Sequence, residues 1–303
     1  MRLATPALRL ASAAALAATL PGRAAPQNGL EAARPALEAR IASHHGTVGL
    51  AAIDLRTGAT LAIRGDEPFP AASVIKVPVL VELFHQVHEG RIRLDDPLVL
   101  LEADKKPGSG ILQFLTAPHQ LTVRDAAFLM IALSDNTATN LILDKIGVRN
   151  VALRMDSLGL RRTRIFRKVF SSEPALEPDS AARYGLGMTT PLEMARLFAL
   201  LYRGEAVSPE ASREMLALLK AQFYRDRIPR LLPPGTEVAH KDGSLDATRN
   251  DCGIVFARGH DYVLCIFTTG NRDRSWRLDN EAHLLIAELA RIVHQAVAGT
   301  PAE

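Results

Sequence analysis

A serine and a lysine stand three residues apart in the otherwise apolar stretch "AASVIKVPVL", residues 71–80. One helical turn would place Ser73 and Lys76 on the same face. A serine hydroxyl is a weak nucleophile that needs a neighbouring base, and burial can favour the neutral, basic form of a lysine amine. Taken alone, S-x-x-K also fits a solvated lysine beside a serine helix cap. Other motifs therefore have to distinguish a nucleophile from a cap.

Two further polar motifs follow in the chain. "SDN", residues 134–136, lies about 60 residues after Ser73, at a break between two helical segments. "KDG", residues 241–243, lies about 105 residues further on and leads into the last strand-like segments. Three elements in this order and at these spacings are far more specific than any one of them. Together they favour a nucleophilic serine.

The three motifs resemble those of the class A β-lactamases and related penicillin-recognising serine hydrolases. The resemblance covers residues 30–298: "LTVRDAAFLMIALSDNTATNLIL" is similar to the family's helix pair around S-D-N, and "MTTPLEMARLF" to the helix after its omega loop. "SVIKVP" and "GSGILQFL" are closer to the broader serine hydrolase branch. The resemblance implies acylation of a serine by the amide carbonyl of a lactam.

The resemblance also implies a role for each motif residue. Ser73 would be the nucleophile and Lys76 its base, with the amine kept neutral by burial and by a second lysine. Ser134 would pass a proton to the departing nitrogen, and the backbone N–H groups of residues 73 and 244 would form the oxyanion hole. Asp135 is expected to tie its loop to backbone amides. The implied substrate-binding residues are Asn136, Lys241, Gly243 and Ser244.

A base for the second chemical step is harder to assign. Class A β-lactamases use the glutamate of E-x-x-L-N in the omega loop to activate the water that releases the acyl group. Glu173 in "EPAL" lies 68 residues before Lys241, which is the family's spacing, but Glu177 stands where the motif has asparagine. A second carboxylate would raise the pKa of the first. Glu173 is either this catalytic base or a solvated loop residue.

The K-x-G motif departs from the family at its middle position. Asp242 stands where the family has threonine or serine, whose hydroxyl helps to bind the substrate carboxylate. An anionic side chain would repel that carboxylate unless Arg249 or Lys241 pairs with it. An unpaired Asp242 therefore predicts weak penicillin recognition, with Ser244 and Thr248 as the remaining hydroxyl donors.

The rest of the chain sets the context for this site. Its 303 residues are 48% hydrophobic and 23% charged with a net charge of +3, which is typical of a globular protein and too balanced to indicate nucleic-acid binding. No metal is expected, because no His, Cys or Glu cluster has zinc-site spacing. Export would permit a disulfide between Cys252 and Cys265, but two buried thiols are favoured.

The N-terminal residues resemble a cleavable secretory signal. Arg2 and Arg9 precede an uncharged Ala/Leu run at residues 10–20, which is followed by small residues around a cut near Ala25. Residues 1–25 are thus predicted to be the signal peptide, and 26–303 the mature hydrolase domain. The apolar run is too short to anchor the chain across a bilayer. A secreted or periplasmic protein follows.

The elements that must position the motifs indicate an α+β fold. A helix near residues 29–43 is followed by a hairpin turning at Arg56-Thr57-Gly58, a long helical segment, strands near 235–269 and a final helix at 279–297. Helix starts are marked by Thr122, Thr190 and Ser208. We therefore expect an antiparallel sheet built from both chain ends and flanked by helices (30–70 plus 223–298). An all-helical subdomain (71–222) would be inserted beside it, with the site between the two halves.

Three functions remain open from the sequence. The first is an exported serine hydrolase that hydrolyses β-lactam amide bonds through an acyl-enzyme on Ser73. The second is a D-alanyl-D-alanine peptidase or transpeptidase-like enzyme that deacylates slowly, and the third is a penicillin-binding or sensor module that acylates once. All three act on a β-lactam or a peptidoglycan-like peptide and imply no cofactor, no nucleic acid and no membrane span. A monomer is expected.

Overall fold

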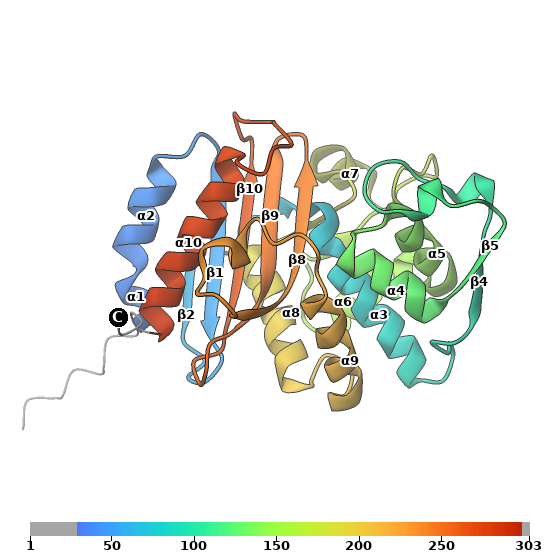
Figure 1. Cartoon of the computed structure of the whole chain (residues 1–303), viewed down its shortest axis with the longest axis horizontal. Coiled ribbons are helices and arrows are strands. Elements are labelled where there is room, and N and C mark those ends of the chain that lie inside the picture. The colour runs from blue at the N-terminus through green and yellow to red at the C-terminus, as the bar shows by residue number, and fades with distance from the viewer. Residues whose placement is uncertain (1–28, 299–303) are drawn as a thin grey trace, which may run out of the picture.

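Strands from both ends of the chain form the central sheet of the computed structural model, which describes residues 29–298 (Figure 1). Its five antiparallel strands run in the order β2-β1-β10-β9-β8. The expected sheet is confirmed, whereas the predicted signal segment lies outside the described residues. The strands are β1 (Thr47–Asp54), β2 (Thr60–Ile63), β8 (Glu237–Leu245), β9 (Thr248–Phe256) and β10 (Tyr262–Thr269).

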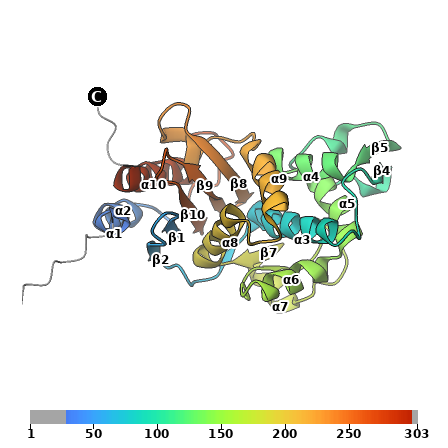
Figure 2. The same ribbon diagram turned by 90° about the horizontal axis from the view of Figure 1, so that it is seen from below.

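Both faces of this sheet are buried, because helices cover each of them (Figures 1 and 2). One face packs against α1 (Gly29–Ala32), α2 (Arg34–Ala42) and α10 (Glu281–Ala298), and the other against α8 (Pro191–Arg203). Successive residues of β10 alternate between two apolar cores: Leu264 and Ile266 belong to the core beneath α10, and Val263 and Phe267 to the core on the α8 side. This two-sided burial explains why β10 is apolar over most of its length.

The helical half lies beside the β8 edge of the sheet (Figure 2). Residues 71–222 were expected to be all-helical, but four short strands also run within them. Besides α8, the helices of this segment are α3 (Lys76–His88), α4 (Val123–Ala132), α5 (Asn136–Ile146), α6 (Val148–Ser157), α7 (Pro178–Tyr184) and α9 (Pro209–Lys220). The 3₁₀ turns are η1 (Ala72–Ile75), η2 (Glu102–Asp104) and η3 (Leu112–Phe114), and η4 (Ile228–Leu231) lies outside this segment. The short strands form a β4–β5 pair (Pro97–Leu100, His119–Thr122) and the ladder β3-β7-β6 (Phe69–Pro70, Gly187–Thr189, Arg164–Ile165).

The predicted helix starts are confirmed. Thr122 and Asp125 form a reciprocal capping box at α4, and Ser208 accepts a hydrogen bond from the Ala211 N–H at α9. Thr190 caps α8 in the same way, but the Glu193 carboxylate turns away to accept from the Arg162 backbone N–H. The caps therefore fix where three of the helices around the site begin.

The two cysteines face each other across the β9–β10 ladder, where Cys252 is the register partner of Cys265. Both are buried free thiols, which confirms the favoured interpretation. Across residues 29–298, none of the helices has the length and apolar character needed to cross a membrane.

Candidate active site

Ser73 lies where the sheet edge meets the helical half, in the 3₁₀ turn that leads into α3. Strand β8 passes very close to it: a Cβ built on Gly243 would lie 2.9 Å from the backbone nitrogen of Ser73. Only glycine permits this approach, which gives the third position of K-x-G a physical reason. Ala72, directly before the serine, has a φ of 48°, an uncommon conformation for a side chain with a Cβ. Such strain is concentrated at functional sites.

Lys76 is fully buried one turn after the serine and reaches the S-D-N motif. Its Nζ lies 2.6 Å from the backbone oxygen of Ser134, 3.1 Å from the Ser134 hydroxyl oxygen and 3.0 Å from Asn136 Oδ1. Two of these oxygens can only accept, whereas a hydroxyl can also donate. A neutral amine would thus donate hydrogen bonds to these two oxygens and accept one from the Ser134 hydroxyl, so all three contacts of Lys76 Nζ would be hydrogen bonds.

The surroundings of Lys76 favour this neutral form. Burial lowers the pKa of the Lys76 ammonium well below its ordinary value, and the positive charge of Lys241 lowers it further, against the opposing effect of Asp242. Burial also lowers the pKa of Lys241 itself. A lysine kept neutral next to a serine is the base that the nucleophile needs.

Asp135 is structural, as predicted. Its carboxylate accepts hydrogen bonds from the backbone N–H groups of Ile111 (2.7 Å), Leu112 (2.9 Å) and Ala138 (2.9 Å), so it caps α5 and holds the preceding loop. Ser134 has a φ of 55°. This left-handed residue and the anchored loop hold the hydroxyl of Ser134 against Lys76.

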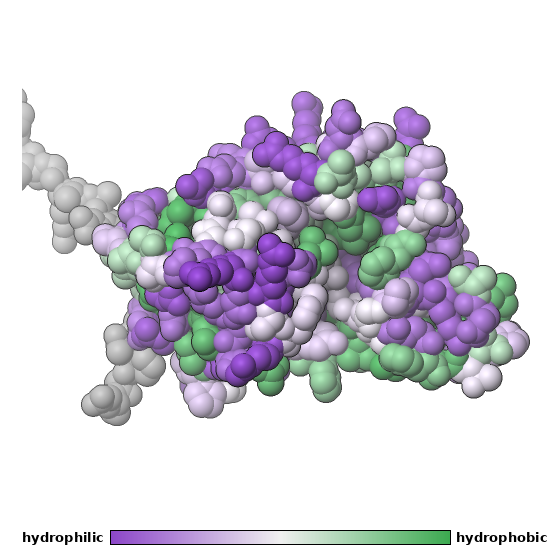
Figure 3. Space-filling view, turned by 90° about the horizontal axis from the view of Figure 1, so that it is seen from above, coloured by the Kyte–Doolittle hydropathy of each residue, from purple (hydrophilic) through white to green (hydrophobic). Residues whose placement is uncertain are grey.

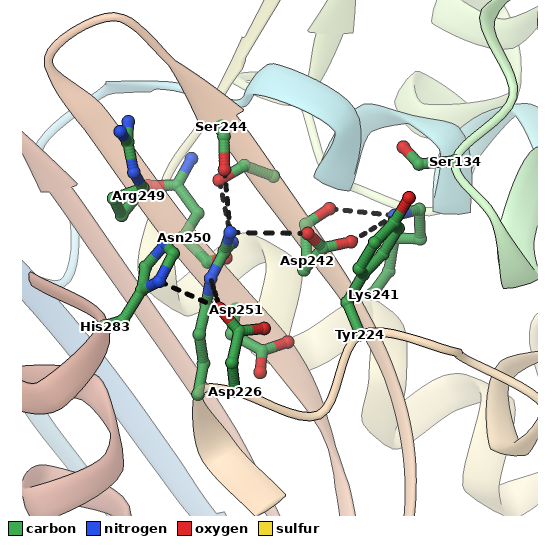
Figure 4. Close-up of polar contacts among 12 residues, drawn as sticks. Ser134, Tyr224, Asp226, Lys241, Asp242, Ser244, Arg249, Asn250, Asp251 and His283 are labelled. Atoms are coloured by element: carbon green, nitrogen blue, oxygen red, sulfur yellow. Dashed lines mark hydrogen bonds and ion pairs between the residues drawn. The ribbon is translucent and has the colours of Figure 1, made fainter. Parts of the chain in front are cut away.

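Asp242 is paired, and one of its partners escaped the sequence reasoning. Its carboxylate lies 2.7 Å from Lys241 Nζ and 3.4 Å from Arg227 Nη2 (Figure 4). Burial acts to raise the pKa of Asp242, but the two positive charges outweigh it and hold this pKa below its ordinary value. Arg227 belongs to no motif, and a single arginine in a loop carries no signal that would have identified it.

Arg249, the other expected partner of Asp242, has a different role. Its guanidinium donates to backbone oxygens, including those of Thr248 at 2.8 Å and Ser275 at 2.7 Å, and stacks 4.7 Å from the centre of the Trp276 ring. It therefore braces the loop that carries Trp276. Of the two predicted partners, only Lys241 contacts the Asp242 carboxylate.

A cavity of about 730 Å³ opens over these residues. Ser73, Asn136 and Ser244 line it together with the 167–172 segment and Trp276. Seen from above, the surface is hollowed between two hydrophilic lobes, and neutral and apolar residues gather in the hollow (Figure 3). The structure thus brings the three motifs to one cavity. Lys76, Ser134, Lys241 and Gly243 lie directly behind its lining residues.

Glu173 does not line the cavity that holds Ser73. Its side chain is 64% exposed and pairs with Lys168 at 3.0 Å, and the residue lines a neighbouring cavity with Asn140 and Asp144. Among the described residues that line the Ser73 cavity, the only carboxylate is that of Asp246, which points outward to Arg274. The role of Glu173 as the deacylating base stays a prediction.

A different residue of the 166–173 segment is held against the site. The side-chain amide of Asn140 makes two hydrogen bonds to the backbone of Val169: it donates to the Val169 oxygen at 2.9 Å and accepts from the Val169 N–H at 2.8 Å. Val169 lines the cavity that holds Ser73. Asn140 lies one helical turn after Asn136 on α5, so its spacing from the S-D-N motif was a usable signal that the sequence reasoning missed.

The comparisons with known proteins agree with this geometry. The model of the "Beta-lactamase enzyme family" matches residues 32–297. A β-lactamase of Streptomyces fradiae is 30% identical over 95% of this chain and 93% of its own length. The crystal structure of a β-lactamase from Sphaerobacter thermophilus has a TM-score of 0.77 at 32% identity, covering 92% of this chain and all of that one.

A second solved structure shows an acylated relative. It is the L158E mutant of PBP-A as an acyl-enzyme complex with penicillin G, with a TM-score of 0.76 at 31% identity over 92% of this chain and 98% of that one. The family match covers most of the chain and the folds are similar throughout. The site agrees with both, because Ser73 lines the cavity and the buried Lys76 contacts Ser134 directly behind it. The chain belongs to the β-lactamase enzyme family and is a serine hydrolase of the class A type.

Proposed function

We propose that the protein opens β-lactams by forming an acyl-enzyme on Ser73 and that release of the acyl group limits turnover. The contact of Lys76 Nζ with the Ser134 hydroxyl at 3.1 Å, beside Ser73, carries the first half of this proposal. The second half, slow release, rests on the 167–172 segment, which lines the cavity without contributing a carboxylate that could activate water.

Acylation follows from the positions of three side chains. Neutral Lys76 takes the hydroxyl proton of Ser73 as the serine oxygen attacks the lactam carbonyl carbon. Ser134, in contact with Lys76, then donates its proton to the lactam nitrogen as the C–N bond breaks, and it regains a proton from the Lys76 ammonium. The products of this step are an ester on Ser73 and a ring-opened amine.

Deacylation requires a water that attacks the ester. A positioned base that removes a proton from this water contributes on the order of 10²–10⁴ in rate. The Asp246 carboxylate points away to Arg274, and Glu173 faces a neighbouring cavity. A long-lived acyl-enzyme is therefore expected, and its decay after exposure to benzylpenicillin can be followed by intact mass alongside nitrocefin turnover.

The same observation favours a second candidate, a peptidase or transpeptidase-like enzyme that acts on peptide amides. Slow release of a penicilloyl group is compatible with faster release of a peptidyl group if an amine rather than water accepts it. Export through residues 1–25 and action as a monomer complete the proposal. Adding a peptide and a D-amino acid acceptor to the assay separates the two candidates.

Glu173→Gln should change the lifetime of the acyl-enzyme less than about threefold, because an exposed ion pair contributes little. The measurement is the decay of the penicilloyl mass peak after excess drug is removed. Glu177→Gln, which alters the neighbouring acid, provides the comparison. A slowing of about 10²-fold or more in the Glu173 variant alone would identify Glu173 as the base.

Val169→Glu should shorten the acyl-enzyme lifetime by about tenfold or more, because it adds a proton acceptor to the cavity wall that Asn140 holds in place. Burial would raise the pKa of the new carboxyl, so the decay is best measured at pH 8. Val169→Gln is the matched control, with the same size and no basic oxygen. Equal lifetimes in the Glu and Gln variants would show that a missing base does not limit release.

A further inference from the structure

We propose that Asp242 fills the anion-binding position of the active site with the protein's own carboxylate. The site would then prefer lactams and amides that carry no free carboxylate beside the scissile nitrogen. This inference rests on acylation of Ser73, as proposed above, and adds the substrate class.

The Asp242 carboxylate forms ion pairs with two cations at β8, Lys241 and Arg227. Lys241 Nζ lies 2.7 Å from its Oδ1, and Arg227 Nη2 lies 3.4 Å from its Oδ2 (Figure 4). The Lys241 side chain is fully buried, and that of Asp242 is only 11% exposed. These are close, mostly desolvated pairs rather than surface contacts, so water screens them little.

The remaining donors of these two cations are largely occupied as well. Arg227 Nη1 donates to the backbone oxygens of Gly243 at 3.0 Å and Asn250 at 2.6 Å, and its Nη2 donates to the Ser244 hydroxyl at 2.7 Å. A second N–H of Lys241 donates to the backbone oxygen of Asp242 at 3.0 Å. The guanidinium is therefore bound within the protein, and a substrate anion would have to compete for it.

The group attached to the scissile nitrogen faces this cluster. Ser134 hands its proton to that nitrogen, so the substituent on the nitrogen lies on the Ser134 side of the site. Asp242 directly precedes Gly243, which lies against the Ser73 backbone. Arg227, the partner of Asp242, also donates to the hydroxyl of Ser244 in the cavity lining. Figure 4 shows Ser134 across from the Lys241–Asp242 pair. A carboxylate on that substituent would approach Asp242 as a like charge.

Such a like charge has a measurable effect. Two anions about 4 Å apart in a partly buried site repel strongly enough to change a rate by about tenfold or more. An uncharged ester or amide at this position meets no repulsion, and Ser244 remains in the cavity lining as a hydroxyl contact. Internal peptide amides and neutral lactams fit this environment better than substrates with a terminal carboxylate.

The test compares a penicillin with its methyl ester on the intact protein. Second-order rate constants for acylation of Ser73 are measured by intact mass, and each is divided by the rate of alkaline hydrolysis of the same compound. We expect the unaltered protein to favour the ester or to accept both equally. Asp242→Asn, which keeps the shape and removes the charge, should shift the acid-to-ester ratio toward the acid by about tenfold or more.

Asp246→Asn is the matched charge control. Asp246 also lines the cavity, but its carboxylate is 72% exposed and pairs with Arg274. This variant should leave the acid-to-ester ratio within about threefold, because an exposed charge is screened. If Asp242→Asn does not fold, as judged by its thermal transition, Asp242→Ser replaces it, since it also removes the charge.

Two results would overturn this inference and leave the proposed function standing. One is a tenfold preference of the unaltered protein for the acid, and the other is an equal shift of the acid-to-ester ratio in the Asp242 and Asp246 variants. Labelling of the protein by neither compound would instead remove the proposed function, and this inference with it. A preference for the ester that is lost in Asp242→Asn and kept in Asp246→Asn supports the assignment.

Discussion

Ser73→Ala should abolish covalent labelling by a fluorescent penicillin and lower β-lactam turnover by about 10³-fold or more. The variant removes the oxygen that forms the ester. Ser73 lies in the wall of the cavity, and the buried Lys76 follows it by one helical turn. The free energy of unfolding should change by no more than about 0.5 kcal/mol, because within the described chain the Ser73 hydroxyl makes no hydrogen bond.

The matched control is Ser109→Ala, which removes another serine hydroxyl from the lining of the same cavity. The backbone oxygen of Ser109 accepts a hydrogen bond from the Asn136 N–H, and Ser109→Ala keeps that oxygen. Labelling should therefore proceed as in the unaltered protein. Labelled peptides identified by mass would locate the acylated residue. Persistent labelling of Ser73→Ala, at Ser134 or Ser244 for instance, would show that the nucleophile is misassigned.

The parts of the site that the sequence predicted are those fixed by local structure. Helical periodicity puts Ser73 and Lys76 on one face, and the strand–turn pattern puts Lys241 and Gly243 on β8. The structure then brings these elements together because β8 is an edge strand and a glycine lets it approach the turn at Ser73. Residue type and spacing were enough to identify these residues, because the local backbone positions each motif.

The parts that escaped prediction depend on contacts between distant segments. Arg227 precedes a short 3₁₀ turn and reaches the site only because it bonds to backbone oxygens of β8 and β9. No periodicity or turn signal encodes such a contact. The sequence indicated that Asp242 would need a partner, but it could not name an arginine that belongs to no motif.

The 166–177 loop shows the same limit. Counting residues back from Lys241 selects Glu173, yet the wall of the Ser73 cavity is formed by residues 167–172, where Asn140 holds the backbone of Val169. Backbone hydrogen bonds of a loop depend on its three-dimensional path, and equal spacing along the chain does not reproduce it. Glu173 therefore lies apart from the other candidate residues, in the wall of a neighbouring cavity.

Lys76→Met should lower the rate constant for acylation of Ser73 by about 10²–10⁴-fold at neutral pH. Methionine preserves the length and apolar packing of the buried side chain but cannot accept the serine proton. The measurement is the rate of penicilloyl mass gain under excess drug. Lys220→Met, on α9 and paired with Glu237, is the control and should acylate normally.

The pH dependence of the acylation rate distinguishes a base from a structural lysine, because only the loss of a base would change it. Burial and the Lys241 charge lower the pKa of Lys76, so the amine is neutral at pH values above this lowered pKa and charged below it. Acylation of the unaltered protein should therefore fall as the pH drops through the lowered pKa, while Lys76→Met should lack that limb. A Lys76→Met variant that keeps most of the rate and the same acidic limb would place the base elsewhere, and the next candidate would be Lys241, the other buried lysine at the site.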